Sequence, residues 1–201
     1  MSGPAYTRLD VDERRRRLLV LGADLFTRHD YDKLSMAKIA KEAGISKALL
    51  YHYFPSKEAY FVATLEEKAE ELAQRTAPDP ALPPLEQFAS SLDAYLGWIE
   101  ENAGSYDKMI RSGAAVPEVR AMLDRVRGDT AQRIVDGLRG EEPASPLLRT
   151  AVRGWLGFID GACLDWVAHR DLDRQTLHGL LLGTLLGAVM AAGEGGLQAG
   201  G

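Results

Sequence analysis

The sequence predicts an all-α protein of about nine helices, with a small N-terminal domain followed by a larger helical one. Apolar residues recur at spacings of three and four along most of the chain, which is the period of an amphipathic helix. No segment alternates polar and apolar residues for long enough to indicate a β-strand. Four prolines between positions 77 and 84 cannot continue a helix and mark a linker between the two domains.

Capping residues and breakers set the bounds of the N-terminal helices. Ser35 and Ser46 each precede a short helical pattern, where a side-chain oxygen can accept a hydrogen bond from a free backbone N–H. Gly44 lies between them, at a position where a left-handed backbone turns the chain sharply. Pro55 stops the third helix, and Ser56 opens the fourth. The predicted helices are therefore at about residues 11–28, 36–43, 47–53 and 57–74.

Five further helices are predicted beyond the linker. The pattern is interrupted at Gly104, between Gly113 and Pro117, at residues 140–143 and at Asp171. The helices are therefore expected at about residues 84–103, 105–112, 117–139, 146–170 and 174–192. Residues 193–201 follow the last helix and predict a disordered tail.

Charge and cysteine content narrow the possible partners. Residues 1–60 hold 11 Lys/Arg against 8 Asp/Glu, a net of +3, whereas residues 61–201 hold 13 against 21, a net of −8. The basic N-terminal part is suited to bind a polyanion, whereas the acidic remainder would be repelled by one.

Cysteine content and the N-terminal sequence indicate the compartment. Cys163 is the single cysteine, which fits a reducing compartment. A signal peptide would have an apolar segment near the N-terminus, where this sequence has an arginine run at 14–17. The most apolar segment, 177–192, is shorter than the roughly 20 residues of a membrane span, so we expect a cytoplasmic protein with no membrane partner.

The segment from Ser35 to Lys57 has the features of a helix pair that reads DNA. Ala40 and Ala43 let the two helices cross closely, and Gly44 makes the turn between them. Their shared core is expected to consist of Ile39, Ile45 and Leu50. The polar groups of the second helix that are expected to face outward are Ser46, Lys47, Tyr51, His52 and Tyr53. The plainer interpretation is a helical hairpin with a solvated polar face, and the number of coincident features favours DNA binding.

Over roughly residues 14–65 the sequence resembles the TetR family of regulators. The matching motifs are Leu25-Phe26, Ser35 with Ile39-Ala40, Ala43-Gly44-Ile45-Ser46, Leu50-Tyr51-His52-Tyr53-Phe54 and Ser56-Lys57-Glu58. The resemblance implies that Lys47, Ala48 and Leu49 face base edges. It also implies that Ser35, Tyr51, Tyr53 and Lys57 hold phosphates, with His52 reaching either. This division agrees with the chemistry, because Lys47 can donate to guanine acceptors, whereas a tyrosine hydroxyl fixes register on any sequence.

Two positions depart from the family pattern. Leu49 stands where the family usually has a small residue or threonine, and it either reads a thymine methyl group or packs inward and reads nothing. Asp30 stands where the family commonly has glycine after the first helix. Aspartate tolerates a left-handed backbone moderately well, so we expect the turn to survive.

The resemblance also implies a homodimer in which helices 146–170 and 174–192 form a four-helix bundle with their mates. The sequence gives an independent reason, since glycine costs about 1 kcal/mol in a helix interior and these two helices carry six. They are Gly154, Gly157, Gly161, Gly179, Gly183 and Gly187. Close approach of helices is one explanation, and space for a ligand is the other. A dimer would place two recognition helices in successive major grooves about 34–36 Å apart, as a palindromic operator requires.

Aromatic and methionine residues in the larger, C-terminal domain predict a pocket for an unidentified small-molecule effector that is mostly apolar. The alternative is that these residues only pack the hydrophobic core. The candidate residues lining the pocket are Tyr95, Trp98, Ile99, Tyr106, Met109, Ile110, Met122, Val126, Trp155, Phe158 and Ile159. Asp160 is a candidate polar anchor, and Asp165 is expected to pair with His169. The chain shows no phosphate-binding glycine loop, no nucleophile elbow, no base paired with Cys163 and no third metal ligand, so neither catalysis nor a cofactor or metal is predicted.

The sequence as a whole predicts a ligand-responsive repressor that binds double-stranded DNA as a homodimer. The alternative is an effector-independent DNA-binding protein that a protein partner controls. An enclosed cavity among the four helices predicted between residues 84 and 170 would favour control by an effector. A solid core there would favour control by a partner. The expected organisation is a helix-turn-helix domain at residues 1–57, a connecting helix at 58–76, a ligand-binding and dimerisation domain at 77–192, and the tail.

Overall fold

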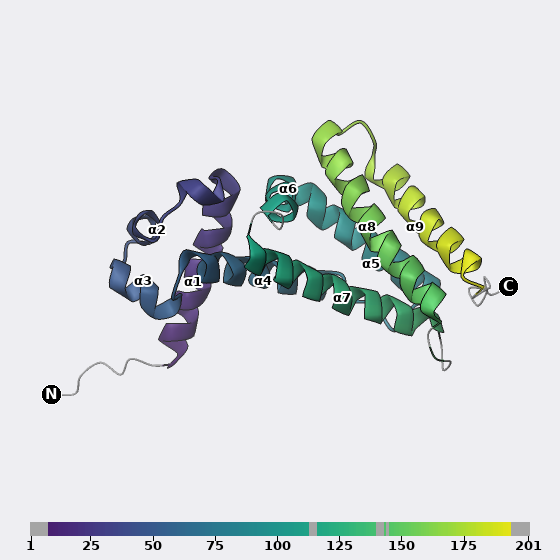
Figure 1. Ribbon diagram of the computed structural model, residues 1–201, viewed down its shortest axis with the longest axis horizontal. Helices are drawn as coiled ribbons and strands as arrows, with labels where there is room; N and C mark the ends of the chain where they lie inside the picture. The colour runs from purple at the N-terminus through teal and green to yellow at the C-terminus, as the bar shows by residue number, and fades with distance from the viewer. Residues whose placement is uncertain (1–7, 113–115, 140–142, 144, 194–201) are drawn as a thin grey trace. The chain divides into compact units, whose positions relative to one another are not determined.

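A computed structural model describes residues 8–112, 116–139, 143 and 145–193 of the chain (Figure 1). Within these residues every regular element is helical, which confirms the predicted all-α fold. The elements are α1 (Arg8–Arg28), the 3-10 helix η1 (Tyr31–Lys33), α2 (Met36–Glu42), α3 (Lys47–Tyr53), α4 (Lys57–Arg75), α5 (Pro84–Glu101), α6 (Ala103–Ser112), α7 (Pro117–Arg139), α8 (Pro146–His169) and α9 (Arg174–Ala191). The predicted tail, apart from Gly193, lies outside the described residues.

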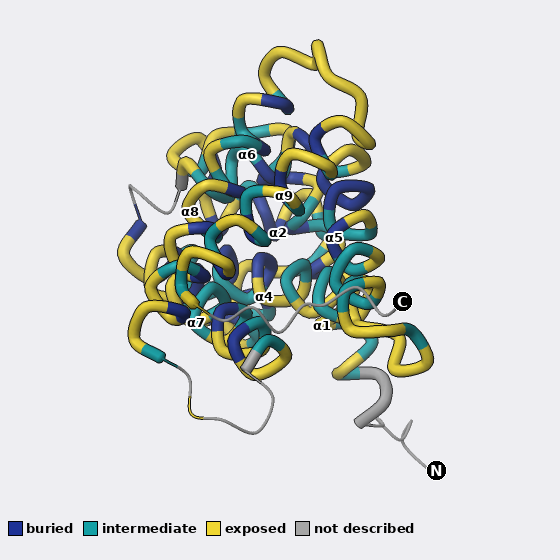
Figure 2. Tube along the Cα trace, turned by 90° about the vertical axis from the view of Figure 1, so that its right-hand side faces the viewer, coloured by how far each residue is buried: buried dark blue, intermediate teal, exposed yellow. Residues whose placement is uncertain are grey.

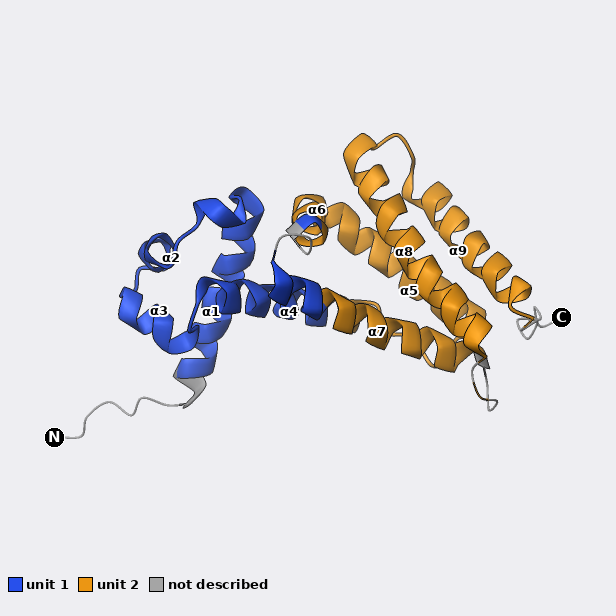
Figure 3. Ribbon diagram, viewed as in Figure 1, with its two compact units in different colours: residues 1–70, 111–122 blue, residues 71–110, 123–201 orange. Residues whose placement is uncertain are grey.

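The chain divides into two compact units (Figure 3). Unit 1 comprises Met1–Glu70 and Arg111–Met122, and unit 2 comprises Glu71–Ile110 and Leu123–Gly201. The division therefore falls inside α4, not at the linker expected from the prolines. It also assigns the first residues of α7 to unit 1, which the sequence pattern did not indicate.

Unit 1 is built around apolar side chains from α1, α2, α3 and α4. Leu25, Ile39, Leu50 and Tyr60 are almost completely buried, and burial along the chain is drawn in Figure 2. An aromatic cluster joins α1, η1, α3 and α4 through contacts among Phe26, Tyr31, Phe54, Tyr60 and Phe61. Because the two short helices α2 and α3 cannot bury a core alone, α1 and α4 supply the surface on which they are held.

A close crossing of α1 and α4 lies within unit 1. A Cβ added at Gly22 would lie 2.5 Å from Thr64 Oγ1 and 2.8 Å from the Tyr60 hydroxyl, closer than real Cβ contacts. The Tyr60 hydroxyl donates a buried hydrogen bond to the carbonyl oxygen of Leu18 on α1. Only glycine at position 22 allows this approach, and sequence analysis did not identify it.

Unit 2 packs α8 against α9 and both helices against α5. The inward face of α9 consists of Leu177, Leu181, Leu185 and Val189, at regular spacings of four. On α8 the buried positions are Leu148, Val152, Trp155, Ile159, Cys163 and Trp166. The Trp155 indole donates to the Leu181 carbonyl oxygen at 2.9 Å and ties the two helices together.

Two helix ends differ from the sequence expectation. The turn after α1 was expected to use a left-handed Asp30, but Asp30 is extended with φ −66° and ψ 145° and precedes η1. The turn is made by η1, in which the Lys33 and Leu34 N–H groups donate to the Asp30 and Tyr31 carbonyl oxygens, and it contains no left-handed residue. After α8, where Asp171 was the expected break, Arg170 adopts the left-handed conformation with φ 56°. Among the described residues no helix combines the length and apolarity that a membrane crossing requires.

Candidate nucleic-acid interface

Two capped helices joined at a glycine form the candidate interface. The Ser35 Oγ accepts a hydrogen bond from the Lys38 N–H at 3.2 Å, and the Ser46 Oγ accepts one from the Leu49 N–H at 3.1 Å. Gly44 has φ +66°, the left-handed conformation that the sequence predicted. The two caps therefore fix where α2 and α3 begin, and the turn at Gly44 follows the end of α2, as the sequence indicated.

The helix α3 presents one face to the core and another to solvent. Leu50 is completely buried, whereas Lys47, Ala48, Tyr51 and His52 are exposed. Exposed donors and a small residue on a capped helix match the requirements of major-groove reading, where side chains must reach base edges unhindered. All four are residues that the resemblance assigned to DNA.

Three further positions are only half-buried. Leu49 and Tyr53 are neither exposed like Lys47 nor buried like Leu50, and Ile45, expected in the shared core, is half-buried as well. Leu49 therefore does not leave the surface completely, as full inward packing would require. Its exposed part is available to a thymine methyl group, beside the exposed Lys47 and Ala48.

Contacts on the surface of α3 order three of the exposed side chains, Lys47, Tyr51 and His52. The Lys47 ammonium lies 5.6 Å from the centroid of the Tyr51 ring, one turn further along the helix. The rings of His52 and Tyr53 meet edge to face with centroids 5.7 Å apart. Such contacts limit the rotamers of long side chains and lower the entropy that is lost on binding.

Lys57, implied to hold a phosphate, already has a partner within unit 1. Its ammonium donates to the Tyr31 carbonyl oxygen at 3.1 Å and lies 3.9 Å from the centroid of the Tyr31 ring. The Tyr31 hydroxyl donates to Glu58 Oε1 at 2.8 Å, and the pKa of Glu58 is lowered by its own backbone N–H and by this hydroxyl. Lys57 therefore positions η1 against the start of α4, with a third N–H remaining for a phosphate. Sequence analysis did not identify this role of Tyr31, because Asp30-Tyr31-Asp32 indicates only an interruption of the helical pattern.

Three members of the arginine run at 14–17 on α1 have contacts that the structure defines. Arg16 and Arg17 both pair with Glu13, at 3.1 and 3.0 Å. The Arg15 guanidinium lies 5.5 Å from the centroid of the Phe54 ring, at the end of α3. Arg15 is thus the member of the run that the structure places beside α3.

In the body, eight of the eleven predicted pocket residues meet in one apolar core. Trp98, Ile99, Tyr106, Trp155 and Ile159 are buried members of the unit 2 core, and Tyr95, Met109 and Ile110 pack against it. The other three do not join them. Met122 is buried but belongs to unit 1, Val126 is half-buried on α7, and Phe158 is 42% exposed on α8.

A polar cluster crosses this core from α5 and α6 to α7 and α8. The Tyr95 hydroxyl donates to the Tyr106 hydroxyl at 3.4 Å, and the Tyr106 hydroxyl donates to Asp160 Oδ1 at 3.3 Å. Arg127 donates to Asp160 Oδ2 from Nε at 2.8 Å and forms an ion pair with it at 2.7 Å. Burial raises the pKa of both tyrosines, so their hydroxyls stay protonated donors. Asp160 is the polar residue that sequence analysis proposed, and Arg127 is one that it missed.

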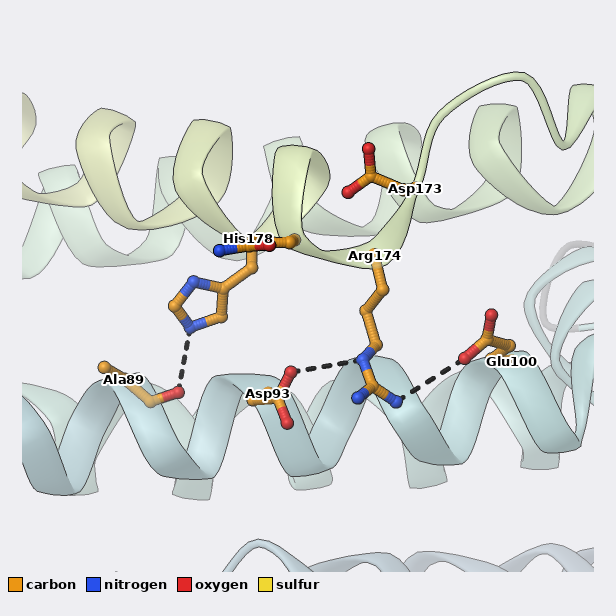
Figure 4. Close-up of a pocket in the computed structure, with 7 residues that line it drawn as sticks. Ala89, Asp93, Glu100, Asp173, Arg174 and His178 are labelled. Carbon is orange, nitrogen blue, oxygen red and sulfur yellow. Dashed lines mark hydrogen bonds and ion pairs between the residues drawn. The ribbon is translucent and has the colours of Figure 1, made fainter.

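A surface hollow of about 680 Å³ lies between α5 and the start of α9 (Figure 4). Arg174 bridges the helices, 3.2 Å from Asp93 Oδ1 and 3.5 Å from Glu100 Oε2. The His178 Nε2 lies 2.9 Å from the carbonyl oxygen of Ala89. None of the predicted pocket residues lines this hollow, and its charged groups already have partners within the protein. The hollow is therefore neither the apolar pocket that the sequence suggested nor the enclosed cavity that would favour an effector.

The other ionisable residues of the body have ordinary structural partners. Asp165 pairs with His169 at 3.3 Å on an exposed edge of α8, as predicted. Burial raises the pKa of the Cys163 thiol to about 12, so this cysteine is a protonated, inert core residue. Among the described residues, no three His, Cys, Asp or Glu side chains gather as a metal site would need.

Comparison with known proteins gives matches to both halves of the chain. Residues 18–64 match the family described as bacterial regulatory proteins, tetR family, and residues 84–187 match the tetracyclin repressor-like C-terminal domain. A crystal structure of a tetR-family transcriptional regulator from Streptomyces coelicolor has 29% sequence identity and a TM-score of 0.78, covering 90% of this chain and 82% of that one.

Two curated relatives are transcriptional regulators. The transcriptional activator FasR of Mycolicibacterium smegmatis is 31% identical over 123 residues, 58% of this chain and 54% of that protein, so the match spans about half of its length. The transcriptional regulator UidR of Escherichia coli K12 is 26% identical over 190 residues, 91% of this chain and 96% of that protein. Neither matching family description is that of an enzyme. The chain belongs to the TetR family of bacterial transcriptional regulators, with α2 and α3 as its DNA-binding helix-turn-helix.

Proposed function

We propose that this regulator is a repressor that binds a palindromic operator as a homodimer and is released by a mostly apolar small molecule. The observation that carries the proposal is the outward face of α3, where Lys47, Ala48, Tyr51 and His52 are exposed beside a completely buried Leu50. From α3, Lys47, Ala48 and Leu49 face base edges, and Tyr51 and Tyr53 hold phosphates. Ser35 before α2 and Lys57 at the start of α4 hold further phosphates and keep the helix in register. Ser46 and His52 complete the contact surface.

The homodimer is supported by the glycines of α8 and α9. All six are exposed, and a Cβ added at any of them would meet no atom within 4 Å. These glycines therefore do not serve the packing of α8 against α9, nor do they leave room inside unit 2. Their cost of about 1 kcal/mol each is explained by close approach of a second copy. We call the six glycines with Phe158, Leu180 and Met190 the glycine face.

Exposed apolar side chains on the glycine face agree with burial by a partner. Phe158 is 42% exposed, Leu180 48% and Met190 73%. The α9 sequence from Gln175 to Met190 contains no Asp, Glu, Lys or Arg. An apolar face flanked by small residues is suited to a twofold helix bundle, in which the same patch meets itself.

DNA binding is tested by titrating the purified protein against a fragment from upstream of its own coding sequence at several salt concentrations. Lys47→Ala is expected to weaken operator binding more than binding to random DNA, whereas Tyr51→Ala is expected to weaken both. Because tyrosine is uncharged, Tyr51→Ala should weaken binding without changing the salt slope, which falls by about 0.9 only when a cationic phosphate contact is lost. Arg133→Ala, which removes one exposed charge from α7, is the matched control and should change neither. Unchanged affinity in Tyr51→Ala would contradict the proposed contacts.

Dimerisation is tested by sedimentation of Leu180→Glu against Val20→Glu. Both variants place a carboxylate on an exposed apolar position, but Leu180 lies on the glycine face and Val20 lies on α1. We expect Leu180→Glu to sediment as a monomer and Val20→Glu as a dimer. A dimeric Leu180→Glu would place the interface elsewhere.

Effector control and its sign are tested with a reporter gene behind the operator and a panel of apolar metabolites. If the protein is a repressor, reporter output should be higher when the regulator is deleted. A true effector should give the same high output in cells that contain the regulator, and it should release the purified protein from DNA. If no compound releases DNA, the result favours the alternative in which a protein partner controls the regulator.

A further inference from the structure

We propose that the effector is an uncharged, mostly apolar molecule with a carbonyl oxygen, which the donors Tyr95, Tyr106 and Trp98 bind in the core of unit 2. This inference rests on the proposed function of unit 2 as the effector-binding part. It goes further by assigning the polar anchors and the functional group that they recognise.

The first argument is the length of two hydrogen bonds in the cluster. Tyr95, Tyr106 and Arg127 form a network that ends on the single carboxylate of Asp160. The hydroxyl contacts, at 3.4 and 3.3 Å, are far longer than the roughly 2.7–2.8 Å of a good O–H···O hydrogen bond. A ligand carbonyl oxygen beside the two hydroxyls would accept a hydrogen bond of normal length from each, in place of the two long ones.

The second argument is a buried donor without a partner. The Trp98 side chain is 2% exposed, and its indole N–H makes no hydrogen bond within the described structure. Trp98 lies three residues after Tyr95 on α5, so both side chains share one face of the helix. Leaving such an N–H unsatisfied costs about 1–3 kcal/mol, which an acceptor on a ligand would recover.

The charges of the cluster select an uncharged ligand. Arg127 and Asp160 neutralise each other at 2.7 Å, with side chains 36% and 20% exposed, so the pair forms the outer end of the cluster. Because this pair is already neutral, the cluster offers no unpaired charge that would bind either a ligand carboxylate or a ligand ammonium. Tyr95, Tyr106 and Cys163 stay protonated because burial raises their pKa, so they add no charge.

The test uses two matched series of compounds, each with one apolar body and three head groups. The first series is 2-decanone, decanoate and decylamine, and the second is 2-acetylnaphthalene, 2-naphthoate and 2-naphthylmethylamine. Binding to the full-length protein is measured by isothermal titration and by the shift in thermal unfolding. We expect at least one ketone to bind at least ten times more tightly than the acid and the amine of its series. Equal or tighter binding by an acid or amine, or no binding by either ketone, overturns the proposal.

Variants assign the binding to these donors. Tyr106→Phe and Trp98→Phe each remove one donor while keeping an aromatic ring, and each should weaken ketone binding about 3- to 10-fold, the range for one hydrogen bond. Trp166→Phe is the control, because the Trp166 N–H already donates to the Leu172 carbonyl oxygen at 2.8 Å. If ketone affinity is unchanged in both test variants, the assignment is wrong.

The two proposals fail in different ways. If a charged compound releases the protein from DNA, the proposed function stands and the carbonyl inference falls. If a ketone binds with the predicted dependence on Tyr106 but DNA binding is not altered, the site stands and effector control falls.

Discussion

Replacing Gly22 by alanine tests the packing that supports the DNA-binding helices. The added Cβ would lie 2.5 Å from Thr64 Oγ1 and 2.8 Å from the Tyr60 hydroxyl, where ordinary contact is 3.4–4 Å. Neither neighbour is a flexible chain end. The Thr64 hydroxyl donates to the Tyr60 carbonyl oxygen at 2.8 Å, and the Tyr60 hydroxyl donates to the Leu18 carbonyl oxygen. The helices must therefore separate, or a buried hydrogen bond must break.

The expected magnitude follows from opposing contributions. Overpacking in a close-packed core costs about 1–3 kcal/mol, and loss of the Tyr60 hydrogen bond adds about 1 kcal/mol. Alanine recovers about 1 kcal/mol of helix propensity relative to glycine. The free energy of unfolding should therefore fall by about 1–3 kcal/mol in Gly22→Ala.

The assay is urea unfolding at one fixed protein concentration, with Gly137→Ala as the matched control. Gly137 lies on α7, is exposed, and a Cβ there would meet nothing within 4 Å. The control should be more stable than the parent by about 0.5–1 kcal/mol, so the two substitutions are expected to have opposite signs. Equal stabilisation by both would refute the close crossing of α1 and α4. Operator affinity should fall in Gly22→Ala alone.

Three further predictions concern single positions. Gly44→Ala should lower the free energy of unfolding by about 1–2 kcal/mol in urea, because φ +66° is strained for alanine, and an unchanged midpoint would contradict that turn. Arg170→Gly should raise the thermal midpoint by about 2–4 °C in calorimetry, since φ 56° after α8 suits glycine, and a lower midpoint would show that the arginine side chain matters more. The lowered pKa of Glu58 stabilises the fold above the ordinary glutamate pKa, and this contribution is lost as pH falls through the lowered value. Tyr31→Phe should therefore lose less stability than the parent on acidification, and parallel pH profiles would exclude the Tyr31–Glu58 contribution.

The helices were predictable because their signals are local. On α9, Leu177, Leu181 and Leu185 repeat every four residues, and Gly179 and Gly183 repeat on the opposite side. This pattern defines an inward and an outward face without any tertiary information. The caps at Ser35 and Ser46 were equally local, since each side chain bonds a backbone N–H three residues away.

Contacts between distant residues were not predictable in the same way. Lys57 and Tyr31 are 26 residues apart, and Arg127 and Asp160 are 33 apart. A single sequence carries no signal that pairs such residues, because any lysine or arginine fits a solvated surface equally well. The roles of Lys57 as a positioning residue and of Arg127 as a cluster member therefore emerge only from the fold.

Glycine illustrates why residue type alone does not determine structural role. Gly44 is needed for its positive φ, and Gly22 is needed because α4 approaches α1. Gly183 meets neither condition, since it lies in regular helix and its Cβ would touch nothing in this chain. If a second copy packs there, Gly183→Leu should leave an isolated protomer intact and weaken the dimer, whereas Gly22→Ala damages the protomer itself. The surroundings of each Cβ therefore separate a glycine required by this chain from one that we attribute to its partner.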